Sequence, residues 1–389
     1  MRIHIVKLGE TVESIAQSFL LSTARAGEIR QLNNLVAVYP GLKIKIPNLF
    51  EIPSEKIEGT GLVVNGQPVE SVPEIIVTEA LDSIAGTFDF SLPNESIFRD
   101  LFKPYEYQDV EIYSGGDKVI TGTVLNPSPD IKTIVVSGLG KPGILSSMNI
   151  PTGLYPRTFY KTSLKTIFEK YCNLFGIEVE IDPDAREQAN LKFEKTAISP
   201  DEYLSTYLRS LARQRGLIVC SNPDGKLRVA RTLSGPEPVL DLVSPEGANV
   251  KYDANMIYSD YTVLVAGNTV RPPAQANTKI DINVFRQNII QQTERTNESA
   301  QDYLQNQVAR SLVSSFSLDI PLPFVRNANN ELIRPGQKIT VEAPELFIKK
   351  PTDFIILSTR LRFASGSNSC NIGVVPSGWL EGDFIKFWE

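Results

Sequence analysis

Histidine is nearly absent from this sequence of 389 residues, because the only one is His4. A Ser-His-Asp or Cys-His catalytic centre needs an imidazole in a cleft, and zinc sites usually combine several His or Cys ligands. The three cysteines (Cys172, Cys220 and Cys370) are odd in number and widely spaced, with no CxxC pair. These absences disfavour most hydrolase mechanisms. They predict a chain with no metal site, no cofactor and no catalytic residues.

The sequence also lacks a basic surplus and long apolar runs. It has 39 Lys and Arg against 45 Asp and Glu, a net charge of -6. Nucleic-acid binding is therefore disfavoured, since a phosphate-binding surface is normally basic. No stretch approaches the roughly 18 apolar residues of a membrane span, and no signal peptide is readable at the N-terminus. The absence of a disulfide framework suits synthesis in a reducing cytoplasm.

The sequence around the single histidine and the three cysteines favours structural positions for them. His4 stands between Ile3 and Ile5 in a predicted strand, with no carboxylate or cysteine near it in sequence, so a surface-facing side chain is expected. Cys172 lies on the apolar stripe of a predicted helix, and Cys220 ends an apolar strand, so both read as packing residues. Cys370 falls in a polar loop, where its thiol could be exposed. None has the histidine partner that a thiol nucleophile usually needs.

Two enzymatic readings stay open as minor alternatives. Residues 138–143 match the G-x-G-x-x-G pattern of a dinucleotide site and follow a strand, but Pro151 and Pro156 leave little room for the helix that such a site requires. Asp182 and Asp184 could act as a glycosidase pair only if they faced one another across a cleft. The intervening proline favours a turn at this point.

Hydrophobic periodicity divides the chain into four parts. Residues 1–50 show a strand, two helices and a strand, and residues 48–58 resemble a linker. Residues 59–150 contain five or six short strands, with hairpin signals at Asn65-Gly66 and at residues 114–117, which favours a small barrel or sandwich. Residues 151–235 form an α/β insert. Residues 236–389 return to strands, interrupted by one helix near residues 299–312.

Within the insert, residues 199–202 read Ser-Pro-Asp-Glu, a capping box with proline at the first helical position. The predicted fold class is therefore α+β and mainly β. It consists of a small β-α-α-β module, followed by two β-barrel-like domains with an α/β insert between them.

The first module resembles a LysM domain. The matching residues are Val6, residues 9–12 (Gly-Glu-Thr-Val), Ile15-Ala16, Leu32-Asn33, Gly41 and residues 44–47 (Ile-Lys-Ile-Pro). Glu10 replaces the usual aspartate, and Val12 replaces leucine. LysM domains commonly bind N-acetylglucosamine chains through two loops, so the resemblance implies a groove formed by Gly9, Glu10, Thr11, Asn33 and Leu35. One copy of such a groove binds weakly.

The remaining chain resembles the baseplate hub of contractile phage tails, the late-control gene D family, which has relatives in tailocins and injection machines. The matching segments occur in the family's order along the chain: residues 62–66 and 86–90, 102–104, 110–113 and 120–122, 167–179, 334–337 with 339–341, and 378–380. The family implies a homotrimer, in which two β-barrel domains per chain alternate in a pseudo-sixfold ring.

The leading hypothesis is therefore a non-enzymatic hub that joins the tail tube to the central spike. Its expected partners are its own copies, the spike protein, the tube and neighbouring baseplate proteins, which LysM would help to dock. The expected location is the virion baseplate, after synthesis in the host bacterial cytoplasm. The alternative is a LysM-anchored protein that binds or degrades peptidoglycan.

Overall fold

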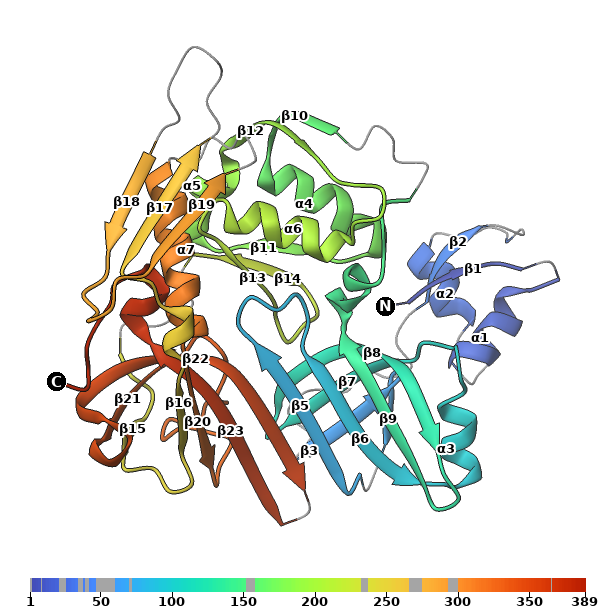
Figure 1. Cartoon of the computed structure of the whole chain (residues 1–389). Coiled ribbons are helices and arrows are strands. Elements are labelled where there is room, and N and C mark those ends of the chain that lie inside the picture. The colour runs from blue at the N-terminus through green and yellow to red at the C-terminus, as the bar shows by residue number, and fades with distance from the viewer. Residues whose placement is uncertain are drawn as a thin grey trace.

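The computed structural model describes residues 2–7, 9–20, 26–33, 38, 42–46, 60–69, 72–151, 158–231, 237–265, 275–292, 300–364 and 366–389. Three hydrophobic cores organise this part of the chain (Figure 1): one in the N-terminal module, one in the insert, and one large core shared by the remaining strands. No helix in these ranges is long and apolar enough to cross a membrane.

The N-terminal module has the predicted β-α-α-β order. Its elements are β1 (Arg2–Ile5), α1 (Val12–Leu20), α2 (Ala26–Asn33) and β2 (Lys43–Ile46), and the two strands pair antiparallel. Helix α1 begins as expected because Thr11 Oγ1 accepts a hydrogen bond from the Ser14 N–H at 3.1 Å. Ile15, Ile29 and Ile44 are fully buried between the helices and the strands. The predicted linker lies outside the described residues.

The first β-module contains seven strands and one short helix. These are β3 (Thr60–Val64), β4 (Gln67–Val69), β5 (Glu74–Ala80), β6 (Thr87–Pro93), α3 (Ser96–Leu101), β7 (Asp109–Ser114), β8 (Asp117–Pro129) and β9 (Thr133–Gly140). Both predicted hairpins are present. Asn65 and Gly66 have φ angles of 50° and 79°, the left-handed pair that a tight turn between twisted strands requires.

The insert has its own core beneath two helices. Its elements are β10 (Thr158–Ser163), α4 (Leu164–Cys172), β11 (Val179–Ile181), α5 (Arg186–Asn190), β12 (Lys192–Ala197), α6 (Leu204–Arg213), β13 (Ile218–Ser221) and β14 (Leu227–Ala230). The ring of Tyr171 lies edge-on to Phe159 and Tyr207, with centroids 5.7 Å and 6.3 Å away. In Figure 1 the insert lies above the strands of the first β-module.

The helix start predicted from the capping box is wrong by about one turn. The Ser199 N–H donates to Glu202 Oε2 at 3.3 Å, which is one half of the box. The Glu202 N–H donates to the Ser199 carbonyl at 3.2 Å instead of the serine hydroxyl and closes an isolated turn. Helix α6 begins only at Leu204, whose N–H donates to the Met148 carbonyl at 2.9 Å. A helix that began at Pro200 would instead direct this N–H to the Pro200 carbonyl.

In the part of the second β-module that the structure describes, there are nine strands and helix α7. These are β15 (Asp241–Val243), β16 (Asn249–Tyr252), β17 (Asp260–Val265), β18 (Gln275–Lys279), β19 (Gln287–Gln292), α7 (Ala300–Ser314), β20 (Phe316–Leu322), β21 (Lys338–Ala343), β22 (Ile348–Ala364) and β23 (Ser367–Pro376), followed by the 3-10 turn η9 (Ser377–Glu381). Helix α7, predicted near residues 299–312, buries Leu304, Val308 and Leu312 in the large core.

Strand β22 joins the two β-modules into one sheet. Its first part pairs with β21, and its last seven residues pair antiparallel with β5, from Ser358 opposite Ala80 to Ala364 opposite Glu74. The result is a 13-stranded sheet with one continuous core. The predicted fold class is confirmed: the chain is mainly β, with an N-terminal β-α-α-β module and an α/β insert. The exact domain boundaries stay a prediction.

Candidate functional site

The turn between β1 and α1 is organised around the Glu10 carboxylate. Its Oε2 atom accepts a hydrogen bond from the Lys7 N–H at 2.7 Å and lies 2.7 Å from His4 Nε2. The Lys7 N–H, and then His4, lower the pKa of Glu10. The His4 side chain is only 11% exposed, so the expectation of a surface-facing residue with no carboxylate nearby is wrong. His4 and Glu10 are six residues apart in the sequence, and the turn between β1 and α1 brings their side chains together.

The other predicted groove residues have mixed environments. Gly9 and Thr11 are exposed in the same turn as Glu10. Asn33 connects α2 to β2, because its side chain accepts from the Lys45 N–H at 2.6 Å and donates to the Ile29 carbonyl at 2.8 Å. Leu35 lies outside the described residues. Glu10 and Asn33 thus hold the backbone of this module, and a sugar-binding role for the set stays a prediction.

The glycines at residues 138–143 have a packing explanation. Strand β9 ends at Gly140 and is followed by the 3-10 helix η3 (Lys141–Ser146). A Cβ atom at Gly138 would overlap the Phe88 ring and the Thr123 carbonyl. A Cβ at Gly143 would lie 2.6 Å from the Leu139 side chain. Close packing therefore explains why both positions are glycine, and a nucleotide site is not needed to explain them.

Desolvation raises the pKa of all three thiols. Cys172 and Cys370 are buried, and burial raises the pKa of each to about 12. The expectation of an exposed loop for Cys370 is wrong, because it lies in β23 opposite Leu361 of β22. Cys220 is partly exposed, and desolvation raises its pKa to about 11. Within the described ranges, no group of three or more His, Cys, Asp and Glu residues could hold a metal ion.

Two arginines of the second β-module hold the β7–β8 hairpin of the first. Arg334 Nη1 lies 3.1 Å from Glu79 Oε2, and its Nη2 donates to the Lys118 carbonyl at 2.9 Å. Arg326 Nη1 lies 2.7 Å from Asp117 Oδ2, and its Nη2 donates to the Ser114 carbonyl. These contacts fix the two β-modules against one another beside the shared strand pair, since Glu79 of β5 lies opposite Thr359 of β22.

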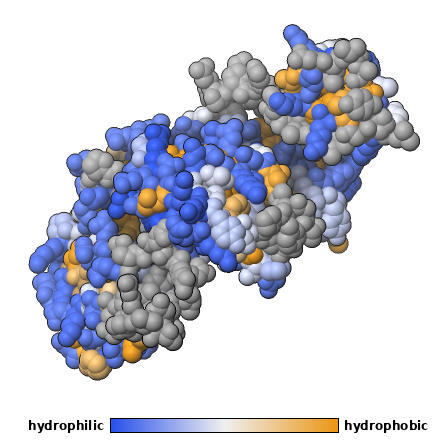
Figure 2. Space-filling view, turned by 90° about the horizontal axis from the view of Figure 1, so that it is seen from above, coloured by the Kyte–Doolittle hydropathy of each residue, from blue (hydrophilic) through white to orange (hydrophobic). Residues whose placement is uncertain are grey.

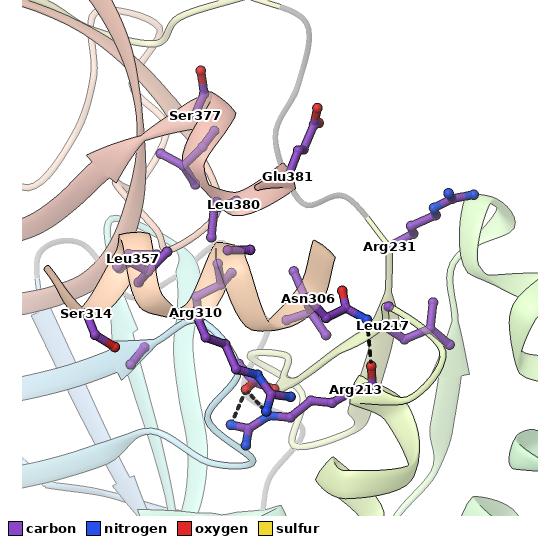
Figure 3. Close-up of a pocket in the computed structure, with 18 of the residues that line it drawn as sticks. Arg213, Leu217, Arg231, Asn306, Arg310, Ser314, Leu357, Ser377, Leu380 and Glu381 are labelled. Atoms are coloured by element: carbon purple, nitrogen blue, oxygen red, sulfur yellow. Dashed lines mark hydrogen bonds and ion pairs between the residues drawn. The ribbon is translucent and has the colours of Figure 1, made fainter. Parts of the chain in front are cut away.

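A groove of about 610 Å³ opens where the insert meets both β-modules (Figure 3). The end of β5, the α6–β13 connection, α7, β22 and η9 all contribute to its walls. Aliphatic side chains form most of the surface: Leu81, Leu217, Ile218, Val313, Ile355, Leu357 and Leu380. None of the described lining residues is aromatic.

Charged side chains are concentrated at two places in this groove. Arg213 binds Asp82 Oδ2 through two nitrogens, at 2.9 Å and 2.5 Å, and Arg310 of α7 points toward the same place (Figure 3). Arg231 and Glu381 lie at the other rim. Three arginines therefore face two carboxylates. The sequence analysis missed this groove, because its lining residues come from separated segments of the chain.

Exposed aromatic residues mark two loops at opposite ends of the large sheet. Tyr105 and Tyr107 are 87% and 58% exposed, with φ angles of 66° and 52°. In the second β-module, Phe347 is 62% exposed with φ of 64°, and its ring contacts Tyr252. Bulky residues rarely adopt left-handed backbone angles, and such strain concentrates at functional sites. Seen from above, the molecule is mainly hydrophilic where it is coloured, with separate hydrophobic patches (Figure 2).

Two family models match separate parts of the chain. Residues 4–47 match the LysM domain, and residues 154–231 match the second domain of the gp44-like baseplate hub protein. The second match covers most of the insert. No curated protein matches the chain in sequence.

Solved structures with a similar fold come from phage tails and from a secretion system. The 43 kDa tail protein of prophage MuSo2 from Shewanella oneidensis has a TM-score of 0.71 and 23% identity, covering 83% of this chain and 100% of that one. A tail protein from Neisseria meningitidis has a TM-score of 0.69 and 17% identity, covering 83% and 99%. An Escherichia coli component of the type VI secretion system, described as similar to the T4 tail proteins gp27 and gp5, has a TM-score of 0.51 and 12% identity, covering 84% and 80%.

These matches agree with the elements described above. The insert with α4 and α6 is the part that the hub model covers. Residues 4–47 are thus similar to a LysM domain and residues 154–231 to the second domain of the gp44-like baseplate hub protein, and the chain has the fold of these phage tail proteins.

Proposed function

We propose that the chain is a structural hub protein of a contractile tail baseplate. One observation carries the proposal: a gp44-like hub domain lies on two β-modules that share one sheet and one core. The similar folds of phage tail proteins support the same reading. The work of such a protein is assembly through large surfaces, with no catalytic step. The described residues offer the exposed aromatic loops and the groove as contact surfaces.

The proposed assembly is a homotrimeric ring with pseudo-sixfold symmetry between the tail tube and the spike. Three chains would supply six β-modules, which can match a sixfold tube above and a threefold spike below. Alternation in β6, β20 and β21 of the large sheet gives these strands one more polar, more exposed face. In β6, Thr87, Asp89 and Ser91 are at least partly exposed, while the residues between them are buried. A polar face of this kind is suitable for lining a water-filled channel.

Solution mass tests the ring. Multi-angle light scattering during size exclusion should give three times the chain mass of 43.1 kDa, alone or after addition of the spike protein. A monomer under both conditions would contradict the trimer. Mass spectrometry of purified tail particles should detect the chain, since the proposed location is the virion baseplate. Absence from intact particles that contain the tube protein would contradict that location.

In this proposal LysM serves mainly to dock neighbouring baseplate proteins. The alternative is a peptidoglycan-binding or peptidoglycan-degrading protein, and the LysM family match is the observation that favours it. A pull-down on purified peptidoglycan separates the two, comparing the full chain with a chain that lacks residues 1–50. The hub reading expects weak retention of both. Strong retention that depends on residues 1–50, together with a monomeric mass, would favour the alternative.

A further inference from the structure

The last part of β8 has a free edge. Residues 117–123 of this strand pair with β7, whereas residues 122–129 pair with β9 on the other side. The Val124 N–H donates to the Gln108 carbonyl at 2.9 Å, and beyond it no described strand pairs with β8 on the β7 side. Ile131, in the turn that follows, is 97% exposed. The end of β8 therefore offers backbone groups and an apolar side chain to a partner.

Strand β16 has a second free edge. It pairs with β20 on one side, and no described strand pairs with it on the other. Just beyond the strand, the Asp253 N–H donates to the Ser315 carbonyl at 2.7 Å. Because backbone N–H groups alternate along a strand, those of Val250 and Tyr252 face the free edge. The two free edges are on opposite sides of the molecule, with β8 at the right and β16 at the left of Figure 1.

The two β-modules repeat one arrangement of strands. The order β5-β6-β9-β8 in the first corresponds to β16-β20-β23-β22 in the second. In each module the last two strands form a hairpin with one extra residue, Leu125 in β8 and Leu357 in β22. The last part of β22, which is the counterpart of the free part of β8, pairs with β5 within the chain. Since β16 is the counterpart of β5, the β22–β5 pair predicts how the two free edges would combine.

We infer that the free edge of β8 pairs antiparallel with the free edge of β16 in a second copy of this chain. The inferred contact rests on the proposed ring, and it names the strands that would close it. Each copy would offer β8 to one neighbour and β16 to the other, a head-to-tail contact that forms a ring where the rotation closes. Three copies would then continue one sheet around the ring, and closure would cover both free edges.

The repeat also determines the register of the contact. Counted from the extra leucines, Pro129 of β8 corresponds to Leu361 of β22, which lies opposite Val77 of β5. Val250 of β16 corresponds to Val77, because following the paired residues strand by strand from each leads to the residue just before the extra leucine. Pro129 of one copy therefore lies opposite Val250 of the next.

The two edges are complementary in hydrogen bonding. The Asp130 N–H donates to the Thr133 carbonyl of β9 at 2.8 Å, so alternation directs the backbone of Pro127 and Pro129 toward the free edge. Proline has no N–H, so at these two positions the edge of β8 accepts hydrogen bonds and cannot donate. The N–H groups on the free edge of β16 supply the missing donors. Two β8 edges lack donors for one another, which favours the head-to-tail contact over a symmetric dimer.

An engineered disulfide tests the register in the full chain, alone and with the spike protein added. Ser128 of one copy lies opposite Lys251 of the next, and facing residues of this kind are about 4.5 Å apart between Cα atoms, within the range of a disulfide. Ser128→Cys combined with Lys251→Cys should give disulfide-linked species of up to three chains on a non-reducing gel, after air oxidation catalysed by copper phenanthroline. Each single variant, and the wild type with its own three cysteines, should stay unlinked.

Absence of linked chains from the double variant in both conditions would overturn the inferred contact. Equal linking in a single variant would indicate random collision and overturn it as well. Linked species longer than three chains would show an open filament, and they would contradict closure of the ring.

Solution mass separates the strand contact from the ring. Val250→Pro removes an N–H from the free edge of β16, and it should reduce the mass from three chains to one where the wild type is trimeric. Val243→Pro on β15 is the matched control and should leave the mass unchanged. Its N–H also faces away from the partner strand, because the next N–H, of Ser244, donates to the Glu342 carbonyl. Circular dichroism verifies folding, and the disulfide decides the contact if Val250→Pro fails to fold.

The contact and the ring can fail separately. A trimeric wild type that shows no disulfide in the double variant and no effect of Val250→Pro would overturn the contact and support the ring. Equal loss of mass in Val250→Pro and Val243→Pro would overturn the contact too. A wild type that is monomeric alone and with the spike protein would contradict the ring and overturn the contact with it.

Discussion

Arg334 Nη1 and Glu79 Oε2 lie 3.1 Å apart, although 255 positions separate these residues in the sequence. Their side chains are only 24% and 12% exposed, so the ion pair is largely shielded from water. It connects a loop before β21 to the end of β5. The same guanidinium also donates to the Lys118 carbonyl. One side chain thus contributes to both an ion pair and a backbone contact between the two β-modules.

Replacement of Arg334 by alanine should destabilise the protein by about 3 kcal/mol. Removal of one partner from a buried ion pair costs about 3–5 kcal/mol, and the lower end applies because buried Glu79 can neutralise itself by taking up a proton. Urea denaturation of the two proteins measures the difference in free energy of unfolding. The matched control is Arg362→Ala, which breaks the exposed pair with Glu74 (50% and 37% exposed) and should cost less than about 1 kcal/mol. Equal losses in the two variants would contradict the structural role of Arg334.

The contribution of Glu79 to stability should increase as the pH falls. Burial raises the pKa of Glu79 above its ordinary value of 4.5, although Arg334 opposes the shift. The folded state therefore binds this proton more tightly than the unfolded state, and stability is lost as the pH rises above 4.5. Comparison with Glu79→Gln by urea denaturation at a series of pH values isolates this effect. As the pH falls, the free energy of unfolding of the wild type should rise relative to that of Glu79→Gln, by at most about 1.4 kcal/mol per pH unit.

That sign is opposite to the usual behaviour of a salt-bridged carboxylate, whose lowered pKa favours the folded state at neutral pH. A wild type that lost stability relative to Glu79→Gln on acidification would show that Arg334 outweighs burial.

Gly138 and Gly140, two positions apart in the glycine motif, should respond differently to replacement by alanine. Gly138→Ala should destabilise the protein by about 1–3 kcal/mol or more, because the new methyl group would overlap the Phe88 ring and the Thr123 carbonyl. Gly140→Ala is the control, since the nearest atoms would lie 3.5 Å away and the cost should be below about 1 kcal/mol. Thermal denaturation without added nucleotide measures both. Equal tolerance of the two substitutions would remove the packing explanation for the motif.

The three thiols should react slowly with Ellman's reagent in the native protein. Cys172 and Cys370 are buried and have pKa values raised to about 12, so little thiolate is present at neutral pH. Cys220 should react first, because it is partly exposed, yet still slowly given a pKa of about 11. Absorbance at neutral pH, with and without denaturant, counts the reacting groups. Rapid labelling of a Cys370-only variant, with Cys172 and Cys220 replaced by serine, would contradict the burial of Cys370.

Local structure was largely predictable from the sequence. Asn65-Gly66 and the glycines at 115 and 116 mark hairpins because these residues adopt left-handed angles at little cost. The apolar stripe of α7, with Leu304, Val308 and Leu312, follows directly from helical spacing. The start of α6 was missed because tertiary contact with Met148 determines where that helix begins.

Long-range relationships were not predictable in this way. No local pattern reveals that Arg334 meets Glu79, that Arg213 meets Asp82, or that Cys370 pairs across a ladder with Leu361. His4 and Glu10 are close in sequence, yet the geometry of a turn decides whether they meet. The groove could not be predicted from local sequence patterns either, because its walls come from five elements that are separated in the sequence.

The pairing of β5 with β22 also has a consequence for how the chain folds. Residues 74–80 leave the ribosome nearly 300 positions before their partners at 358–364. Until β22 has been synthesised, β5 has a free edge toward this side, and exposed edges favour aggregation. Contacts of such long sequence separation also slow folding, because the intervening chain must first close. We therefore expect truncated products that end before β22 to depend on chaperones or be degraded.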